Sequence, residues 1–297
     1  MILLAEHFVR PPEWLWYILF YFFFAGIAGG SYAIGTMLRL SGDPRDEPAA
    51  RIAFLIAGPA TAICPILLTV DLNVSAIRFW HMLINVTPGD TGLNFKYWSP
   101  MSVGVWALLI FGFFAAVSFV DAWKPFLPAA VNRVFNVLGA IVAIYIASYT
   151  GVLLSVSNQP VWSDTWALGG LFLASGLCGS AALLALLIRN RPDASYSLGR
   201  LHQADGYFAV LELALLLIFF VTIGAAGSLD REIVWLPLWA LAVVGIAASL
   251  VEARGHMRTQ VSGSGTAAGL RVDTLVVSIL VLVGVLALRA AVIFSAQ

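Results

Sequence analysis

Long apolar stretches alternate with short polar connections along the whole chain. A helix needs about 20 consecutive apolar residues to cross a bilayer, and eight stretches are of that length. Their apolarity is continuous rather than alternating, which favours helices over the strands of a membrane barrel. The pattern therefore predicts an all-α membrane protein with eight transmembrane helices. We expect the spans at residues 14–38, 52–72, 100–120, 134–156, 166–188, 207–223, 234–251 and 272–294.

The composition agrees with this pattern. Hydrophobic residues make up 61% of the 297 residues and charged residues 11%, whereas soluble proteins have about 25% charged residues. The net charge is zero, so nothing in the composition suggests a nucleic-acid partner. The two cysteines, Cys64 and Cys178, lie in separate apolar stretches. An iron–sulfur cluster needs about four thiolates, so we expect no cluster in this chain and no other metal.

The basic residues predict the orientation in the membrane. Eleven of the 16 Lys and Arg residues lie in the connections after the first, third, fifth and seventh spans. Cytoplasmic loops carry the excess of Lys and Arg. We therefore expect both termini, and the long connection 73–99, on the outer side.

Three local features refine the helices. Gly26 and Gly30 form a pair of small residues one turn apart, which favours close packing of a neighbouring helix, although it could also make room for a ligand. Ser99 followed by Pro100 predicts a helix start. Arg289, in the last span, is expected to extend toward the membrane surface.

Polar side chains gather in the outer layer of three spans. Tyr149 follows Ser148 in span four, Tyr17 and Tyr21 are one turn apart in span one, and Asp71 ends span two. At 1.5 Å per residue, Tyr21 lies about 10 Å and Tyr149 about 13 Å from the outer ends of their spans. A buried tyrosine needs a partner for its hydroxyl. We expect these groups to share a lipid-accessible cavity, although tyrosine is also common near membrane interfaces.

A quinone would suit such a cavity. Its carbonyls need hydrogen-bond donors, its tail needs an apolar channel, and its redox chemistry moves two protons with two electrons. Tyr149 is the candidate for binding one carbonyl. Asp71 or His81, in the outer connection, is the candidate for exchanging protons, while Asp71 could also be a solvated residue at a helix end.

Glu212 is the acid deepest in the membrane, near the middle of span six. With His202 and Asp205 at the inner end of that span, it could begin a proton path from the cytoplasm. The alternative is a structural hydrogen bond to a neighbouring helix.

The histidines argue against a haem. All four, His7, His81, His202 and His256, fall at span ends or in connections. A b-type haem requires facing imidazoles at membrane depth, so we expect none.

Several of these residues, in this order and spacing, resemble the NrfD/polysulfide-reductase family of membrane subunits. The similarity covers spans one to four. Its residues are Ala25 to Gly30, Asp71-Leu72, Arg78-Phe79, Ser99-Pro100-Met101-Ser102 with Trp106, and Tyr149-Thr150-Gly151.

The resemblance implies a specific organisation. Family members have two four-helix bundles, here residues 1–158 and 159–297, and bind menaquinone or ubiquinone in the first bundle without haem. They dock on an iron–sulfur subunit with four clusters, which often connects to a molybdenum or tungsten enzyme or to a multihaem cytochrome. Tyr149 matches the family's quinone-contacting tyrosine, and Tyr21 stands where some members have a histidine. The resemblance also implies the plasma membrane of a prokaryote.

Two other functions remain open from the sequence. A solute or ion transporter would be favoured by broken helices and repeated halves. Here only span two carries internal prolines, Pro59 and Pro65, and the halves show no repeat. A purely structural membrane anchor of an oxidoreductase complex is the other alternative.

Overall fold

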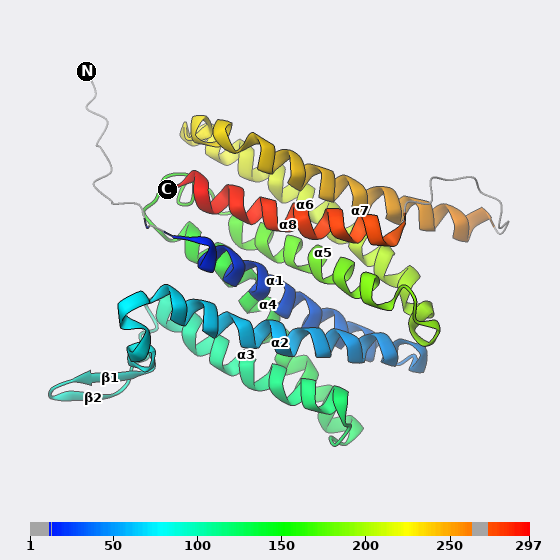
Figure 1. Ribbon diagram of the computed structural model, residues 1–297, viewed down its shortest axis with the longest axis horizontal. Helices are drawn as coiled ribbons and strands as arrows, with labels where there is room; N and C mark the ends of the chain where they lie inside the picture. The colour runs from blue at the N-terminus through cyan, green and yellow to red at the C-terminus, as the bar shows by residue number, and fades with distance from the viewer. Residues whose placement is uncertain (1–11, 13, 263–272) are drawn as a thin grey trace.

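Eight long helices confirm the predicted all-α membrane protein in the described part of the chain (Figure 1). The computed structural model describes residue 12, residues 14–262 and residues 273–297, without the side chains of residues 73–77, 90 and 256–262. Each helix is long and apolar enough to cross a membrane. The helices are α1 Trp16–Leu40, α2 Glu47–Asp71, α3 Pro100–Trp123, α4 Ala129–Ser155, α5 Leu168–Ile188, α6 Ser195–Ala226, α7 Leu236–Ser262 and α8 Thr274–Ser295.

The helices pack in two cyclic sets that meet at α1 and α5. In the first half, α1 packs against α2 and α4, and α3 packs against the same two helices. In the second half, α5 and α7 each pack against α6 and α8. Helix α5 also packs against α1 and α4. A domain boundary after residue 158 remains a prediction.

Glycines allow α1 and α5 to approach each other closely. A Cβ atom added to Gly26 would lie 3.3 Å from the Cα of Gly176 on α5. One added to Gly30 would lie 2.6 Å from the Gly176 carbonyl oxygen. The packing role of this glycine pair is therefore confirmed.

The start of α3 is also as expected. Pro100 is its first residue, and the Ser99 hydroxyl accepts a hydrogen bond from the Ser102 backbone N–H at 3.4 Å. Helix α6, in contrast, begins twelve residues before the predicted span. His202 and Asp205 therefore lie inside a continuous helix instead of at its end.

The connection between α2 and α3 contains structure that the hydrophobic pattern did not predict. A 3-10 segment, Asn73–Met82, leads into strands β1 Ile84–Thr87 and β2 Asp90–Leu93, which pair antiparallel. The turn between them is Pro88-Gly89, and Gly89 has a φ of 91°, a conformation that glycine adopts readily. Figure 1 shows this hairpin beyond the ends of α2 and α3, at the same end as the start of α1 and the end of α8.

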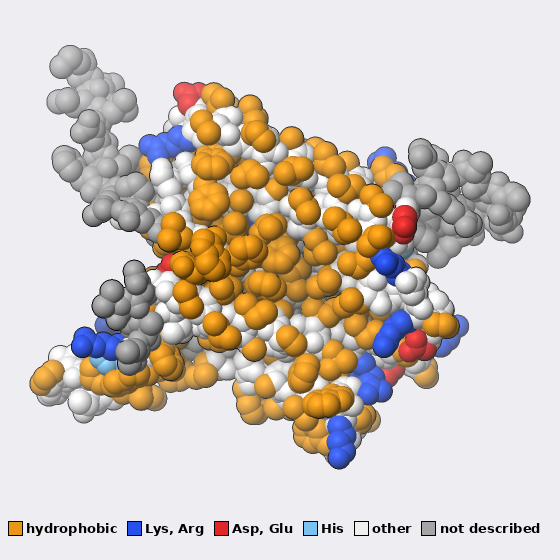
Figure 2. Space-filling view, in the orientation of Figure 1, with side chains coloured by type: hydrophobic (Ala, Val, Ile, Leu, Met, Phe, Trp, Pro, Cys, Tyr) orange, Lys and Arg blue, Asp and Glu red, His pale blue; other side chains and the backbone are white. Residues whose placement is uncertain are grey.

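Buried polar contacts join separate connections at the opposite end of the molecule. Asp46, in the short 3-10 turn Pro44–Asp46, is fully buried and accepts hydrogen bonds from Ser41, Ser197 and Arg200. It thereby joins the α1–α2 connection to the start of α6. Most of the basic side chains visible in Figure 2 lie at this end, and the orientation of the protein in the membrane remains a prediction. Two more 3-10 turns, Pro192–Ala194 and Leu229–Trp235, flank α6.

Candidate functional site

Tyr149 of α4 faces the first turns of α3. Its hydroxyl donates a hydrogen bond to the Pro100 carbonyl oxygen at 2.8 Å. Its ring occupies the space left by Gly104, because a Cβ atom on that glycine would overlap the tyrosine ring. Tyr145, one turn away, stacks on the ring with centroids 5.7 Å apart. Local packing thus fixes Tyr149 against the hairpin end of α3.

Tyr21 of α1 lies near Tyr149 and is 4% exposed. Its phenol is within electrostatic reach of Tyr149 and of Cys64 on α2. No hydrogen bond joins the Tyr21 hydroxyl to another described residue. Thr150, beside Tyr149, likewise has a fully buried hydroxyl without a partner in the described part of the protein. Buried hydroxyls normally have partners, so this layer holds spare hydrogen-bonding capacity.

The other residues predicted for the site lie around this pair. Asp71, the last residue of α2, is half-buried. It is seven residues, or two helical turns, beyond Cys64, so it lies on the same face of α2 about 10 Å nearer the hairpin end. Tyr17 is half-buried, and its ring centroid lies 3.9 Å from that of Trp16. Ser148 faces away, because its hydroxyl donates to the Gly169 carbonyl oxygen of α5 at 3.1 Å.

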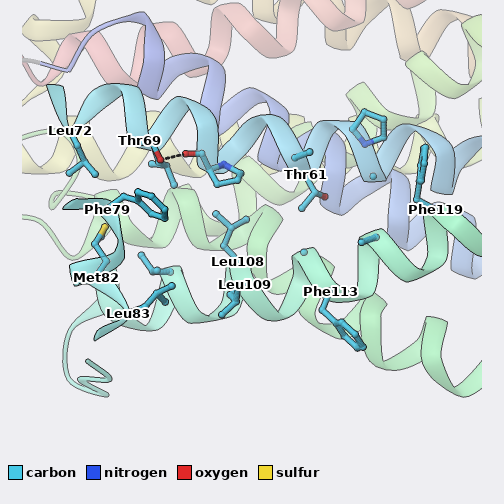
Figure 3. A pocket seen from close by; sticks show the side chains of 18 of the residues that line it. Thr61, Thr69, Leu72, Phe79, Met82, Leu83, Leu108, Leu109, Phe113 and Phe119 are labelled. Carbon is cyan, nitrogen blue, oxygen red and sulfur yellow. Dashed lines mark hydrogen bonds between the residues drawn. The ribbon is translucent and has the colours of Figure 1, made fainter. Parts of the chain in front are cut away.

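Two large cavities lie beside this tyrosine layer, and neither is lined by Tyr21 or Tyr149. One is an apolar groove of about 780 Å³ between α2 and α3 (Figure 3). The other is a pocket of about 460 Å³ at the hairpin end, which includes His81. The structure therefore brings Tyr21 and Tyr149 together, while His81 lines a separate pocket and Ser148 faces α5. The expected cavity shared by all of these residues is not one of these two.

The three residues predicted for a proton path lie buried on α6. His202, Asp205 and Glu212 are each less than 5% exposed. Cys178 of α5 lies beside both Asp205 and Glu212.

Partners from α7 and α8 continue this buried set toward the end opposite the hairpin. The His202 Nε2 atom is 3.5 Å from the Glu252 Oε1 atom of α7. The same Glu252 oxygen accepts a hydrogen bond from the hydroxyl of Thr274, at the start of α8, at 3.1 Å. The buried acids thus continue to the first turn of α8.

Arg289 corrects one expectation. Its side chain does not extend to the membrane surface but is fully buried. The guanidinium donates to the Phe22 carbonyl oxygen at 3.2 Å, to the Ser175 hydroxyl at 2.9 Å and to the Phe172 carbonyl oxygen at 3.1 Å. Arg289 lies on the face of α8 that meets α1 and α5, and it is within electrostatic reach of Glu212.

Sequence reasoning missed this role of Arg289, although an ionisable residue inside a span is itself a signal of function. Among the residues that the structure describes, His, Cys, Asp and Glu form no group of three able to hold a metal ion. The absence of haem and metal from this protein remains a prediction.

Comparison with known proteins agrees with this architecture. The sequence is 24% identical to the C subunit of polysulfide reductase from Wolinella succinogenes over 96% of its own length and 94% of that protein's. It is 27% identical to protein NrfD of Escherichia coli K12 over 73% of each protein, and 24% identical to an NrfD homologue of Haemophilus influenzae over 72% of each. The family model described as polysulphide reductase, NrfD, matches residues 6–297. The protein is therefore a multi-pass membrane protein of the NrfD/polysulphide reductase family.

Proposed function

We propose that this protein is the quinone-reactive membrane subunit of a respiratory oxidoreductase complex, in the plasma membrane of a prokaryote. A relative that matches nearly its whole length is named as the C subunit of polysulfide reductase, and the relatives that we compared are bacterial. The eight spans provide the membrane part of such a complex. In this proposal the protein exchanges electrons between an extrinsic partner and menaquinone or ubiquinone.

The observation that carries the proposal is the Tyr21 phenol, which is 4% exposed, lies close to Tyr149 and makes no hydrogen bond to another described residue. A hydroxyl that loses water on burial and gains no other partner costs free energy of about 1–3 kcal/mol. A quinone carbonyl is an acceptor that would satisfy it. Phe22, whose ring centroid lies 5.4 Å from that of Tyr21, provides an apolar surface that suits the rest of the ring.

Each residue of the layer then has a defined task. Tyr21 donates a hydrogen bond to one carbonyl. Tyr149, held by the Pro100 carbonyl, positions the other side of the ring and can exchange that acceptor for the ligand. Asp71, two turns from Cys64 toward the hairpin end, exchanges protons with the outer solution. The quinone itself supplies two-electron, two-proton redox chemistry when bound.

The other candidate residues have indirect roles in this scheme. Tyr17 lies one turn above Tyr21 and extends the layer toward the surface. His81 reaches the site only through the hairpin-end pocket. Ser148 does not face the site, and its hydrogen bond to the Gly169 carbonyl oxygen helps α4 to pack on α5.

We place the partner at the hairpin end of the molecule. Exposed aromatic side chains gather in that connection, with Tyr97 77% and Trp98 68% exposed. They suit a protein partner or the membrane interface. The partner we propose is an iron–sulfur subunit with four clusters, linked to a molybdenum or tungsten enzyme or to a multihaem cytochrome.

The second half offers a proton path in this proposal. His202, Asp205 and Glu212 are buried, and the half-buried Glu252 lies beside His202, so the four residues run from the end opposite the hairpin toward the middle of the bundle. Arg289 lies within electrostatic reach of Glu212 and donates to the carbonyl of Phe22, the neighbour of Tyr21. In this proposal the acids and His202 carry protons as far as Glu212, and Arg289, which keeps its own proton, holds a positive charge near that residue.

Conservative tyrosine variants of the purified complex test the quinone site. Tyr21→Phe keeps the ring and removes the free donor, so we expect quinone-coupled turnover to fall about tenfold. Tyr149→Phe should also lower turnover. The control is Tyr145→Phe, since Tyr145 is 42% exposed on the same helix, and its turnover should be unchanged. Equal turnover in Tyr21→Phe and Tyr145→Phe would reject the assignment.

The purified complex also distinguishes this proposal from a transporter and from a purely structural anchor. A transporter would purify alone, whereas this subunit should carry iron–sulfur partners with it. A purely structural anchor would keep its partners and yield no quinone on solvent extraction.

A further inference from the structure

The groove between α2 and α3 is a long apolar cavity. Figure 3 shows Leu108 and Leu109 of α3 across the groove from the part of α2 between Thr61 and Thr69. Space is left open along one wall, because a Cβ atom added to Gly112 would meet nothing within 4 Å. At about 780 Å³, the groove is in the range of cavities that hold a sizeable organic ligand.

The groove continues into the polar pocket at the hairpin end. Leu72 and Met82 line both cavities. The polar pocket, of about 460 Å³, is lined by Arg78, His81 and Lys96 and by no acidic residue. A cavity of this shape has an apolar body and a cationic mouth.

The charges at the mouth have no acidic partner in the described part of the protein. Among the described residues, no carboxylate lies within salt-bridge distance of Arg78 or Lys96. Figure 2 shows basic side chains and a histidine together at the hairpin end. This end is the predicted outer side, where basic residues are under-represented in membrane proteins. Two of the few basic residues on that side therefore converge on one pocket.

We propose that the groove and the pocket together bind one anionic phospholipid. An acyl tail lies in the groove between α2 and α3, and the phosphate lies between Arg78 and Lys96 with His81 beside it. A quinone ring carries no charge, so two unpaired cations favour a phosphate over a quinone at this mouth. The site is separate from the tyrosine layer and does not depend on the proposed function.

The lipid would also order the outer connection. Phe79, Met82 and Leu83, from the segment between α2 and the hairpin, line the outer end of the groove. Figure 3 shows these side chains beside Leu72 at that end. An acyl tail in the groove would contact all three and hold the connection against α2 and α3.

Charge variants test the mouth of the site. The purified complex is placed in nanodiscs that contain equal amounts of phosphatidylglycerol and phosphatidylcholine. The lipids that it retains are then counted by native mass spectrometry. In Arg78→Gln/Lys96→Gln we expect the retention of phosphatidylglycerol over phosphatidylcholine to fall about tenfold. The control is Arg231→Gln, an exposed cation of the α6–α7 connection, which should keep the native preference. An unchanged preference in the double variant would overturn the proposal.

A second pair of variants tests the groove. Gly112→Leu fills the open wall and should lower the retention of both phospholipids. Gly224→Leu is the matched control, because a Cβ atom on Gly224 of α6 also meets nothing within 4 Å and this residue does not line the groove. If Gly112→Leu keeps its phospholipid, or loses quinone in place of phospholipid, the groove does not hold the proposed ligand.

Discussion

At the scale of single residues, Arg289 and Glu212 are two ionisable side chains buried inside the bundle. Arg289 hydrogen-bonds backbone carbonyls and Ser175, and Glu212 is within its electrostatic reach. A buried charge is costly unless another group compensates it. The backbone carbonyls and the Ser175 hydroxyl therefore compensate the Arg289 guanidinium in the membrane interior, and Glu212 is the acid at which the proposed proton path is tested.

Replacing Glu212 by glutamine tests the path. Glu212→Gln keeps the size of the side chain but cannot release a proton, so proton movement coupled to turnover should be lost in proteoliposomes while electron transfer in detergent continues. An entrapped pH dye measures this. Glu232→Gln provides the control, because Glu232 is equally buried but hydrogen-bonds Trp239, away from the series. Native proton movement in Glu212→Gln would remove this residue from any path.

The depth of the site residues in the membrane could be predicted from the sequence, but the direction in which their side chains point could not. A rise of 1.5 Å per residue is enough to place Tyr21 and Tyr149 in one layer. Successive residues point about 100° apart on a helix, so Ser148 faces α5 while Tyr149 faces α3. Which neighbour stands on which side depends on tertiary packing. For the same reason, the burial of Arg289 could not be derived from its position near the end of a span.

At the scale of elements, the packing of α1 on α5 depends on glycine. The Gly176 backbone lies where side chains at Gly26 and Gly30 would be. Close approach of helix backbones is a main source of stability inside membranes. This contact also joins the helix that carries Tyr21 to the second half of the molecule.

Adding one methyl group at this contact should weaken it. Gly30→Ala would press its Cβ atom against the Gly176 carbonyl oxygen, which is backbone and cannot move aside. We expect a loss of about 1–3 kcal/mol in the free energy of unfolding, measured by denaturation in mixed micelles. Gly224→Ala, in open space on α6, should be neutral or slightly stabilising. If both variants unfold alike, the close contact is not a source of stability.

Elements with a long apolar stretch or a clear helix-start signal were predictable, and the others were not. The eight spans and the start of α3 follow from apolar length and from Ser99-Pro100. The hairpin was missed because its strands are only four residues each, although Pro88-Gly89 is a turn signal. The polar start of α6 was missed because the predicted span contained only its apolar part.

At the scale of the whole molecule, the hairpin end combines the features that the proposed function needs. Tyr21 lies within two turns of the start of α1, and Tyr149 lies within two turns of the end of α4. The exposed aromatic residues of the outer connection lie at the same end. A quinone bound at the tyrosine pair would therefore be close to a partner docked there. The central claim is that the ligand ring lies between α1 and α4.

A photoreactive quinone analogue tests that claim most directly. The purified complex is illuminated with the analogue, digested, and the labelled peptides are mapped by mass spectrometry, with an excess of natural quinone as competitor. We expect competed labelling on α1 around Tyr21 and on α4 around Tyr149. Competed labelling confined to the α2–α3 groove or to α5–α8 would contradict the assignment of the quinone site.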